Sequence, residues 1–191
     1  MVNEKTIIAG FGGQGVMLMG QLLSYVATKE NLNTLWFPSY GPETRGGTAN
    51  CSVTISESNV NSPVISTPDS IIIMNKPSLN KFQSKLKKDG HLLINSSLVK
   101  GLEYREDVNV YEVPANDIAL ELGNLKVANM VMLGAYLEVT KVFTNDQIIN
   151  IMKEKFTGSK ANLIEMNRQA LEEGKKAVRS WSHCIEILRK Y

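Results

Sequence analysis

Short apolar runs alternate along the chain with segments whose apolar residues recur every three or four positions. The short runs are typical of buried β-strands, and the recurring positions are typical of helices with one buried face. The expected strands are Lys5–Ala9, Thr34–Phe37, Thr48–Ser56, Ser70–Met74, His91–Asn95 and Val108–Val113. Pro38 is expected to stop the second strand. In the third strand, alternation places Ala49, Cys51, Val53 and Ile55 on one face.

Helical periodicity marks segments between the strands and most of the chain after them. The expected helices run from Val16 to about Glu30, from Pro77 to about Leu86, and over Asn116–Leu122, Val127–Val139 and Asn145–Lys155. Thr144 or Asn145 is expected to cap the last of these, because either side chain can accept a hydrogen bond from the first turn. From Leu163 to Leu188 an apolar stripe predicts one long amphipathic helix, or two joined near Gly174. Its expected role is to cover its own domain, and docking a partner is the alternative.

Strands that alternate with helices predict an α/β protein. The expected fold is a three-layer α/β/α structure with a Rossmann-like start and a long C-terminal helix. Its sheet is expected to be mostly parallel, and the hairpin-like region from Trp36 to Ile55 makes it a mixed one. A length of 191 residues suits one domain, or one domain with an appendage.

Composition excludes several classes of protein. The chain is 43% hydrophobic and 21% charged, which is ordinary for a soluble globular protein. A net charge of +2 with scattered lysines gives no basic stripe for nucleic acid. Cys51 and Cys184 lie far apart and form no metal-binding motif, so they are expected to be reduced thiols in a cytoplasmic protein. No signal peptide and no membrane-spanning apolar run is expected.

The segment between the first strand and the first helix is rich in glycine. Gly10, Gly12 and Gly15 match the G-x-G-x-x-G spacing, which lets a phosphate approach the backbone at a helix N-terminus. A dinucleotide site also needs an acidic residue at the end of the second strand. That position holds Phe37 or Pro38 instead, so a dinucleotide site is disfavoured. Glycines that only let the helix pack on the strand are the other alternative.

A second loop, Pro38–Gly47, follows the second strand. Two prolines stiffen it, its glycine pair allows a sharp turn, and Arg45 offers a guanidinium suited to a carboxylate or a phosphate. A surface ion pair between Arg45 and Glu43 is the alternative. The two loops together are expected to form one functional rim. Its candidate binding residues are Gly10, Gly12, Gly13, Gln14, Gly15, Tyr40, Glu43, Thr44, Arg45, Gly46 and Gly47.

The sequence contains no recognisable catalytic centre. It has no serine elbow, no H-E-x-x-H zinc motif and no Walker lysine after the glycines. His91 and His183 have no nearby nucleophile pattern and are expected at a surface or a strand end. Asn75 and Asn95 follow strands, where they could line a crevice or cap turns. Asn129 is expected to be a satisfied buried amide, with a role in the site as the alternative. No residue is therefore assigned to catalysis or to a metal.

Two motifs carry a resemblance to a known family. Gly10–Val16 and Ser39–Cys51 resemble the gamma subunit of 2-oxoacid:ferredoxin oxidoreductases, closest to the 2-oxoglutarate type. Supporting matches include Met74-Asn75 and the helix from Val127 to Ala135. The resemblance covers roughly residues 4 to 178. It therefore predicts a single gamma-type domain at residues 1–178 and a helical extension at residues 179–191.

The resemblance implies a role within a larger enzyme. Such enzymes convert a 2-oxoacid and coenzyme A to acyl-CoA and carbon dioxide, and pass electrons to ferredoxin or a similar acceptor. Thiamine diphosphate is implied on alpha and beta subunits, and iron–sulfur clusters on beta and on a ferredoxin-like delta subunit where one is present. This chain would bind no cofactor by itself and would be inactive alone. Its two loops would help to hold coenzyme A or the substrate carboxylate.

Several alternatives stay open from the sequence. The complex could be the branched-chain, pyruvate or indolepyruvate member of the same family rather than the 2-oxoglutarate member. The chain could also be a purely structural assembly subunit, whose glycine loops make only contacts with other subunits. A free-standing nucleotide-binding protein is disfavoured, because the ribose-binding acid is missing.

Overall fold

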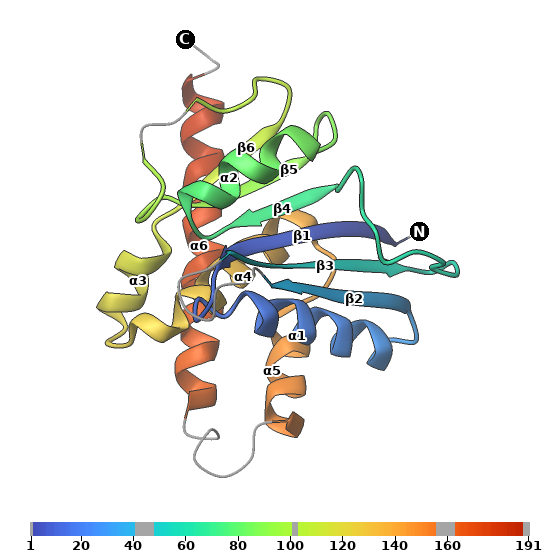
Figure 1. The fold of residues 1–191 in the computed structure, drawn as a ribbon. Helices are drawn as coiled ribbons and strands as arrows, with labels where there is room; N and C mark the ends of the chain where they lie inside the picture. The colour runs from blue at the N-terminus through green and yellow to red at the C-terminus, as the bar shows by residue number, and fades with distance from the viewer. Residues whose placement is uncertain (1, 41–47, 101–102, 156–162, 189–191) are drawn as a thin grey trace.

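A computed structural model describes residues 2–40, 48–100, 103–155 and 163–188, with side chains described as far as Val178. The strands form one six-stranded sheet in the order β2-β3-β1-β4-β5-β6 (Figure 1). Strands β1, β4, β5 and β6 pair in parallel, whereas β3 is antiparallel to both β1 and β2. Among the described strands β3 alone runs in the opposite direction. The predicted mixed, mostly parallel α/β sheet is therefore confirmed.

The strands follow the apolar runs of the sequence. Their bounds are β1 Asn3–Phe11, β2 Asn33–Tyr40, β3 Thr48–Ser56, β4 Ser70–Ile73, β5 His91–Asn95 and β6 Asn109–Val113. The prediction that Pro38 stops the second strand is wrong, because β2 continues to Tyr40. Strand β2 lies at the edge of the sheet and pairs only with β3 in the described part of the chain. An edge strand tolerates proline, since its outward-facing N–H has no partner to lose.

The helices also lie close to their predicted positions. They are α1 Val16–Lys29, α2 Lys76–Phe82, α3 Ala115–Glu121, α4 Ala128–Thr140, α5 Asn145–Lys155 and α6 Ile164–Leu188, with 3-10 helices at Gln83–Lys85 (η1) and Leu125–Val127 (η2). Thr144 caps α5: its Oγ1 accepts from the Gln147 N–H at 3.3 Å, and its own N–H donates to Gln147 Oε1 at 2.8 Å. This reciprocal pair is a capping box. Helix α6 is one continuous helix and does not break at Gly174.

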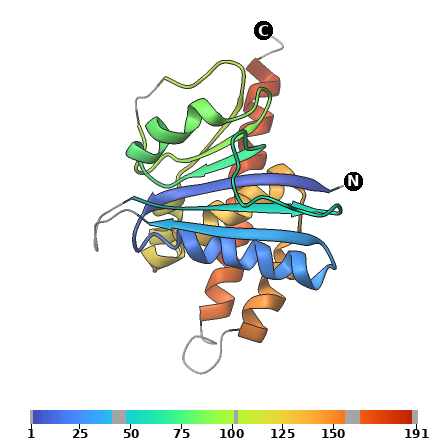
Figure 2. The ribbon, with the colours of Figure 1, turned by 45° about the vertical axis from the view of Figure 1, so that its right-hand side comes forward.

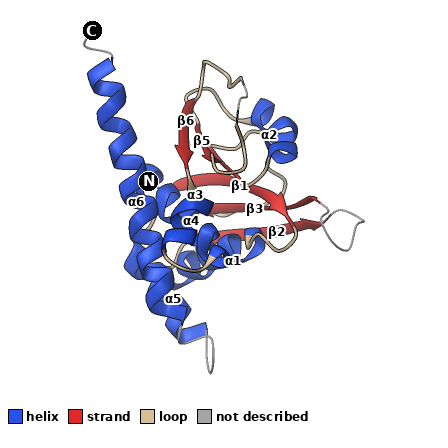
Figure 3. Cartoon of the chain, turned by 90° about the vertical axis from the view of Figure 1, so that its left-hand side faces the viewer, coloured by secondary structure: helices blue, strands red, loops and turns tan. Residues whose placement is uncertain are grey.

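Helices cover the sheet unequally. Helix α2 lies over one face, and α1, α4, α5 and α6 lie over the other (Figures 2 and 3). The larger hydrophobic core lies under these four helices, and the smaller core joins α2 to β1, β4 and β5. Among the described residues, no helix has both the length and the apolarity needed to cross a membrane.

Helices α4 and α6 pack with their backbones in contact. A Cβ added at Gly134 would overlap the Leu171 carbonyl, and one added at Gly174 would overlap the Val131 carbonyl. Glycine at both positions allows α6 to lie directly against α4, which is buried along nearly its whole length. Through Val178, α6 therefore covers its own domain, as its stripe predicted.

Candidate functional site

The glycine turn after β1 lies at the carboxyl end of the parallel strands. From β1 the chain passes through α1 to β2 and β3 on one side, and later returns to β4 on the other side. The connection therefore reverses its direction across the sheet between β1 and β4. In open α/β sheets, ligands bind in the crevice outside the strand ends at such a switch point. The geometry thus favours this end of the sheet as the functional one.

Gln14 links the glycine turn by hydrogen bonds to the end of strand β4. Its Oε1 accepts from the Phe11 N–H at 2.7 Å, and its Nε2 donates to the Met74 carbonyl at 3.2 Å. A Cβ added at Gly10 would lie within 2.9 Å of Gln14, Met74 and Val16. Gln14 therefore holds the turn through hydrogen bonds, and Gly10 has no room for a side chain because it is packed against protein.

Gly12, Gly13 and Gly15 differ from Gly10 in the space beside them or in their backbone conformation. An added Cβ would meet nothing within 4 Å at Gly12 or Gly13. Gly13 and Gly15 have φ values of 94° and 74°, which side chains disfavour. Gly15 also abuts Asn129, whose Nδ2 lies 3.5 Å from the Gly15 carbonyl oxygen. The turn thus keeps an open outer backbone while Asn129 supports it from α4.

The structure brings the glycine turn together with the end of β2. Across the sheet, Gly10 pairs with Ala49, which in turn pairs with Tyr40. A cavity of about 370 Å³ lies between these segments, and Gly12, Gly13, Gly15, Tyr40 and Gln21 are among its lining residues. We call it the rim cavity. Tyr40 is 68% exposed.

The remaining predicted rim residues lie outside the described part of the chain. They are Glu43, Thr44, Arg45, Gly46 and Gly47. Of the described residues that flank them, Thr48 pairs with Phe11 and Tyr40 pairs with Ala49. Their proposed roles in binding stay predictions.

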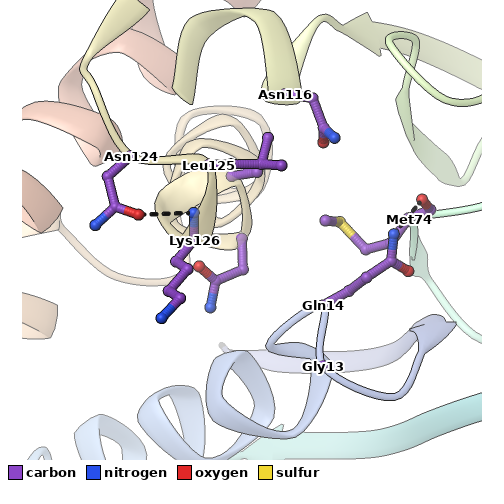
Figure 4. Close-up of a pocket in the computed structure, with 9 residues that line it drawn as sticks. Gly13, Gln14, Met74, Asn116, Asn124, Leu125 and Lys126 are labelled. Carbon is purple, nitrogen blue, oxygen red and sulfur yellow. Dashed lines mark hydrogen bonds between the residues drawn. The ribbon is translucent and has the colours of Figure 1, made fainter. Parts of the chain in front are cut away.

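A second cavity, of about 450 Å³, also borders the glycine turn (Figure 4). It is lined by Gly13, Gln14, Met74, Asn116, Asn124, Leu125, Lys126, Ala128 and Asn129. We call it the crevice cavity. Sequence reasoning missed Asn116, Asn124 and Lys126, which come from α3 and η2 far along the chain. The one available signal was the polar turn that interrupts the helical pattern just before Val127.

Each of the three asparagines singled out from the sequence has a protein partner. Asn75 caps α2, because its Oδ1 accepts from the Ser78 N–H at 2.9 Å. Asn95 is fully buried, and its Nδ2 donates to Asn116 Oδ1 at 2.8 Å. Asn129 is buried as predicted and also lines the crevice cavity. The prediction of a buried amide is therefore confirmed, and a role of Asn129 in the site stays a prediction.

His91 stands at the first position of β5, as expected for a strand-end histidine. Its Nδ1 lies 3.3 Å from the Tyr111 hydroxyl. Burial, with Lys87 nearby, lowers the pKa of the His91 imidazole, so the neutral ring is favoured. The side chain of His183 lies outside the described residues.

Cys51 is enclosed between α1 and β2. Its Sγ lies against Gly20 and Trp36, and burial raises the pKa of its thiol to about 12. A metal or cluster ligand must be a thiolate, which this environment strongly disfavours. Cys51 therefore does not fit an iron–sulfur ligand.

Comparisons with known proteins agree on one family. A family model described as pyruvate ferredoxin/flavodoxin oxidoreductase matches residues 5–177. The ketoisovalerate oxidoreductase subunit VorA of Methanothermobacter marburgensis is 38% identical over 168 residues, which are 87% of this chain and 35% of VorA. This chain thus spans about a third of that relative. The 2-oxoglutarate synthase subunit KorC of the same organism is 32% identical over 186 residues, which are 92% of this chain and 100% of KorC.

Solved structures share the fold. The gamma subunit of a keto/oxoacid ferredoxin oxidoreductase from Geobacter sulfurreducens superposes with a TM-score of 0.79 at 25% identity, covering 93% of this chain and 99% of that one. A 2-oxoglutarate:ferredoxin oxidoreductase from Magnetococcus marinus, solved with 2-oxoglutarate, coenzyme A and succinyl-CoA bound, gives a TM-score of 0.83 at 21% identity. That match covers 94% of this chain and 32% of that one.

Proposed function

Because this chain belongs to the pyruvate ferredoxin/flavodoxin oxidoreductase family, as a gamma subunit of the 2-oxoacid:ferredoxin oxidoreductases, we propose that its glycine turn and Tyr40 hold coenzyme A for the enzyme. The observation that carries this proposal is the open backbone at Gly12 and Gly13, facing Tyr40 across the rim cavity. A backbone without side chains lets a phosphate or thioester group approach its N–H groups closely.

The chemistry itself would take place on partner subunits. Thiamine diphosphate would supply the stabilised carbanion for decarboxylation, and clusters on other chains would carry the electrons to a ferredoxin-type acceptor. Cys51 is the cysteine whose side chain lies within the described residues, and its buried thiol does not fit an iron–sulfur cluster ligand. The contribution of this chain is therefore to bind and orient coenzyme A beside alpha and beta subunits, in the cytoplasm.

We propose 2-oxoglutarate as the 2-oxoacid. The KorC relative aligns along its entire length, which supports a separate gamma subunit of the 2-oxoglutarate type. A branched-chain 2-oxoacid is the second candidate, since the identity to VorA is higher. Initial rates of the purified complex with each 2-oxoacid would decide between them, because the preferred substrate has the higher kcat/KM.

Gly12→Ala tests the rim. An added methyl meets no protein atom within 4 Å, so the variant should assemble and melt like the wild type. The methyl would hinder the approach of coenzyme A, and we expect its KM to rise about tenfold, equivalent to 1.4 kcal/mol. Steady-state kinetics of the complex, with the 2-oxoacid KM as an internal control, measure this effect. An unchanged KM for coenzyme A would refute the binding role and leave a subunit for assembly alone.

A further inference from the structure

The crevice cavity has the charge expected of an anion site. Lys126 is its cation, and none of its lining residues is a carboxylate. The Lys126 side chain is exposed, and its Nζ forms no ion pair among the described residues, so it is available to a ligand. In Figure 4 its side chain extends beside the cavity from η2. A single lysine on a surface is common and does not by itself indicate an anion site. The neighbouring asparagine amides supply the further evidence.

Two asparagine amides are oriented by bonds to the protein. Asn124 Oδ1 accepts from the Lys126 N–H at 3.0 Å, which leaves the Asn124 Nδ2 as its free group. Asn116 Oδ1 accepts from the buried Asn95 Nδ2 at 2.8 Å, which likewise leaves the Asn116 Nδ2 free. Both asparagines line the cavity. Their amide groups therefore add N–H donors to the charge of Lys126, as an anionic ligand requires.

The rest of the cavity is apolar. Met74, Leu125 and Ala128 line it beside the polar groups. A volume of about 450 Å³ is within the range of small-molecule sites. An apolar wall next to a cation and amide donors suits a ligand with a flat base and attached phosphates. This combination describes a phosphorylated nucleoside better than a small carboxylate.

Gly13 lines both cavities, so the glycine turn is the wall between them. An added Cβ there would meet nothing within 4 Å, and a long ligand can therefore cross the turn. We infer that the crevice cavity binds the phosphorylated nucleotide end of coenzyme A through Lys126, Asn116 and Asn124, while the pantetheine arm crosses Gly13 into the rim cavity. This inference rests on the proposed function, because it assumes that coenzyme A is the ligand of the rim.

Lys126→Met in the assembled complex is the first test. The probes are adenosine 3′,5′-bisphosphate and pantetheine, each used as an inhibitor competing with coenzyme A. Loss of a charge-assisted contact should raise the Ki of the bisphosphate about tenfold, and the KM of coenzyme A by a similar factor. The Ki of pantetheine and kcat should not change. Lys88→Met is the matched control, because Lys88 is also exposed but precedes β5 at the opposite end of the sheet.

Asn116→Asp is the second test. The aspartate keeps an oxygen to accept from Asn95 and replaces the free amide with a negative charge. The bisphosphate Ki should therefore rise at least as much as in Lys126→Met. Calorimetric titration of the full chain with the bisphosphate gives a readout independent of turnover. An unchanged bisphosphate Ki in both variants, or no competition by the bisphosphate in the wild type, would overturn the inference.

These results separate the inference from the proposed function. If Gly12→Ala leaves the KM of coenzyme A unchanged while Lys126→Met raises the bisphosphate Ki, the rim and the path of the pantetheine arm across Gly13 are refuted, and only the nucleotide site in the crevice cavity stands. If Gly12→Ala raises that KM while both crevice variants behave like the wild type, the crevice assignment alone is overturned.

Discussion

Glycines serve opposite purposes in two regions of this molecule. At the crossing of α4 and α6, Gly134 and Gly174 have no room for a side chain, because the backbone of the other helix occupies the space. In the turn after β1, Gly12 and Gly13 have no protein atom within 4 Å of an added Cβ. The first pair permits close packing, and the second leaves backbone exposed. The space beside a glycine therefore distinguishes a glycine that permits close packing from one that leaves its backbone open.

Gly174→Ala should have the largest effect. The new methyl would overlap the Val131 carbonyl, and the two helices would have to move apart. We expect a loss of about 3 kcal/mol in the free energy of unfolding, the upper part of the range for overpacked cores. Thermal melting should show a fall of roughly 10 °C for a chain of this size.

Gly20→Ala is the matched control, since Gly20 is also within a helix. Its added Cβ would meet the side chains of Cys51 and Trp36, which can shift more readily than a backbone carbonyl. It should cost clearly less, because the gain in helix propensity of about 1 kcal/mol for alanine over glycine is common to both variants, and only Gly174→Ala meets a backbone carbonyl. Equal losses in the two variants would contradict the distinction between backbone and side-chain contact.

The sequence predicted the bounds of helices and strands better than it predicted features that depend on contacts between them. Strands β3 and β5 and helix α5 have the predicted bounds, because apolar alternation and a capping box are local signals. The end of β2 was wrong, since tolerance of Pro38 depends on an edge position that only the assembled sheet defines. Whether α6 breaks at Gly174 was left open for a similar reason. The contact that needs this glycine lies on α4.

The candidate site was predictable in part. Strand, glycine turn and helix are adjacent in the sequence, so the turn could be found there. The register that places Ala49 between Tyr40 and Gly10 follows from a hairpin that was also anticipated. Lys126 could not be found in this way, because its side chain becomes part of a cavity only when the fold brings η2 near Met74 and the glycine turn. No periodicity within η2 carries that information.

Gly15→Ala should have an intermediate effect, because Gly15 lies in the turn after β1 but, unlike Gly12 and Gly13, has no room for a Cβ. Its φ of 74° is costly for alanine, by about 1–2 kcal/mol, and its Cβ would overlap the Asn129 side chain. We expect a loss of about 2 kcal/mol in urea unfolding. In a double-mutant cycle, Asn129→Ala should remove the overlap but not the backbone strain. Strictly additive losses would show that Asn129 does not restrict this position.

Gly13→Ala should have the smallest effect on stability and tests whether open space indicates a ligand. Gly13 and Gly123 have similar φ values, 94° and 85°, and neither has an atom within 4 Å of an added Cβ. Each alanine variant should therefore lose about 1 kcal/mol through backbone strain alone. Gly123 lines neither cavity, so its variant should keep the KM of coenzyme A.

Gly13 forms the wall between the cavities, and its variant should raise that KM at least several-fold in the complex, since a methyl costs about 1–3 kcal/mol in a filled site. Because the strain is matched, any difference between the two variants in coenzyme A kinetics comes from the position of the methyl. If both variants change the KM equally, strain in the turn would be the cause. Open space beside a glycine would then carry no information about a ligand.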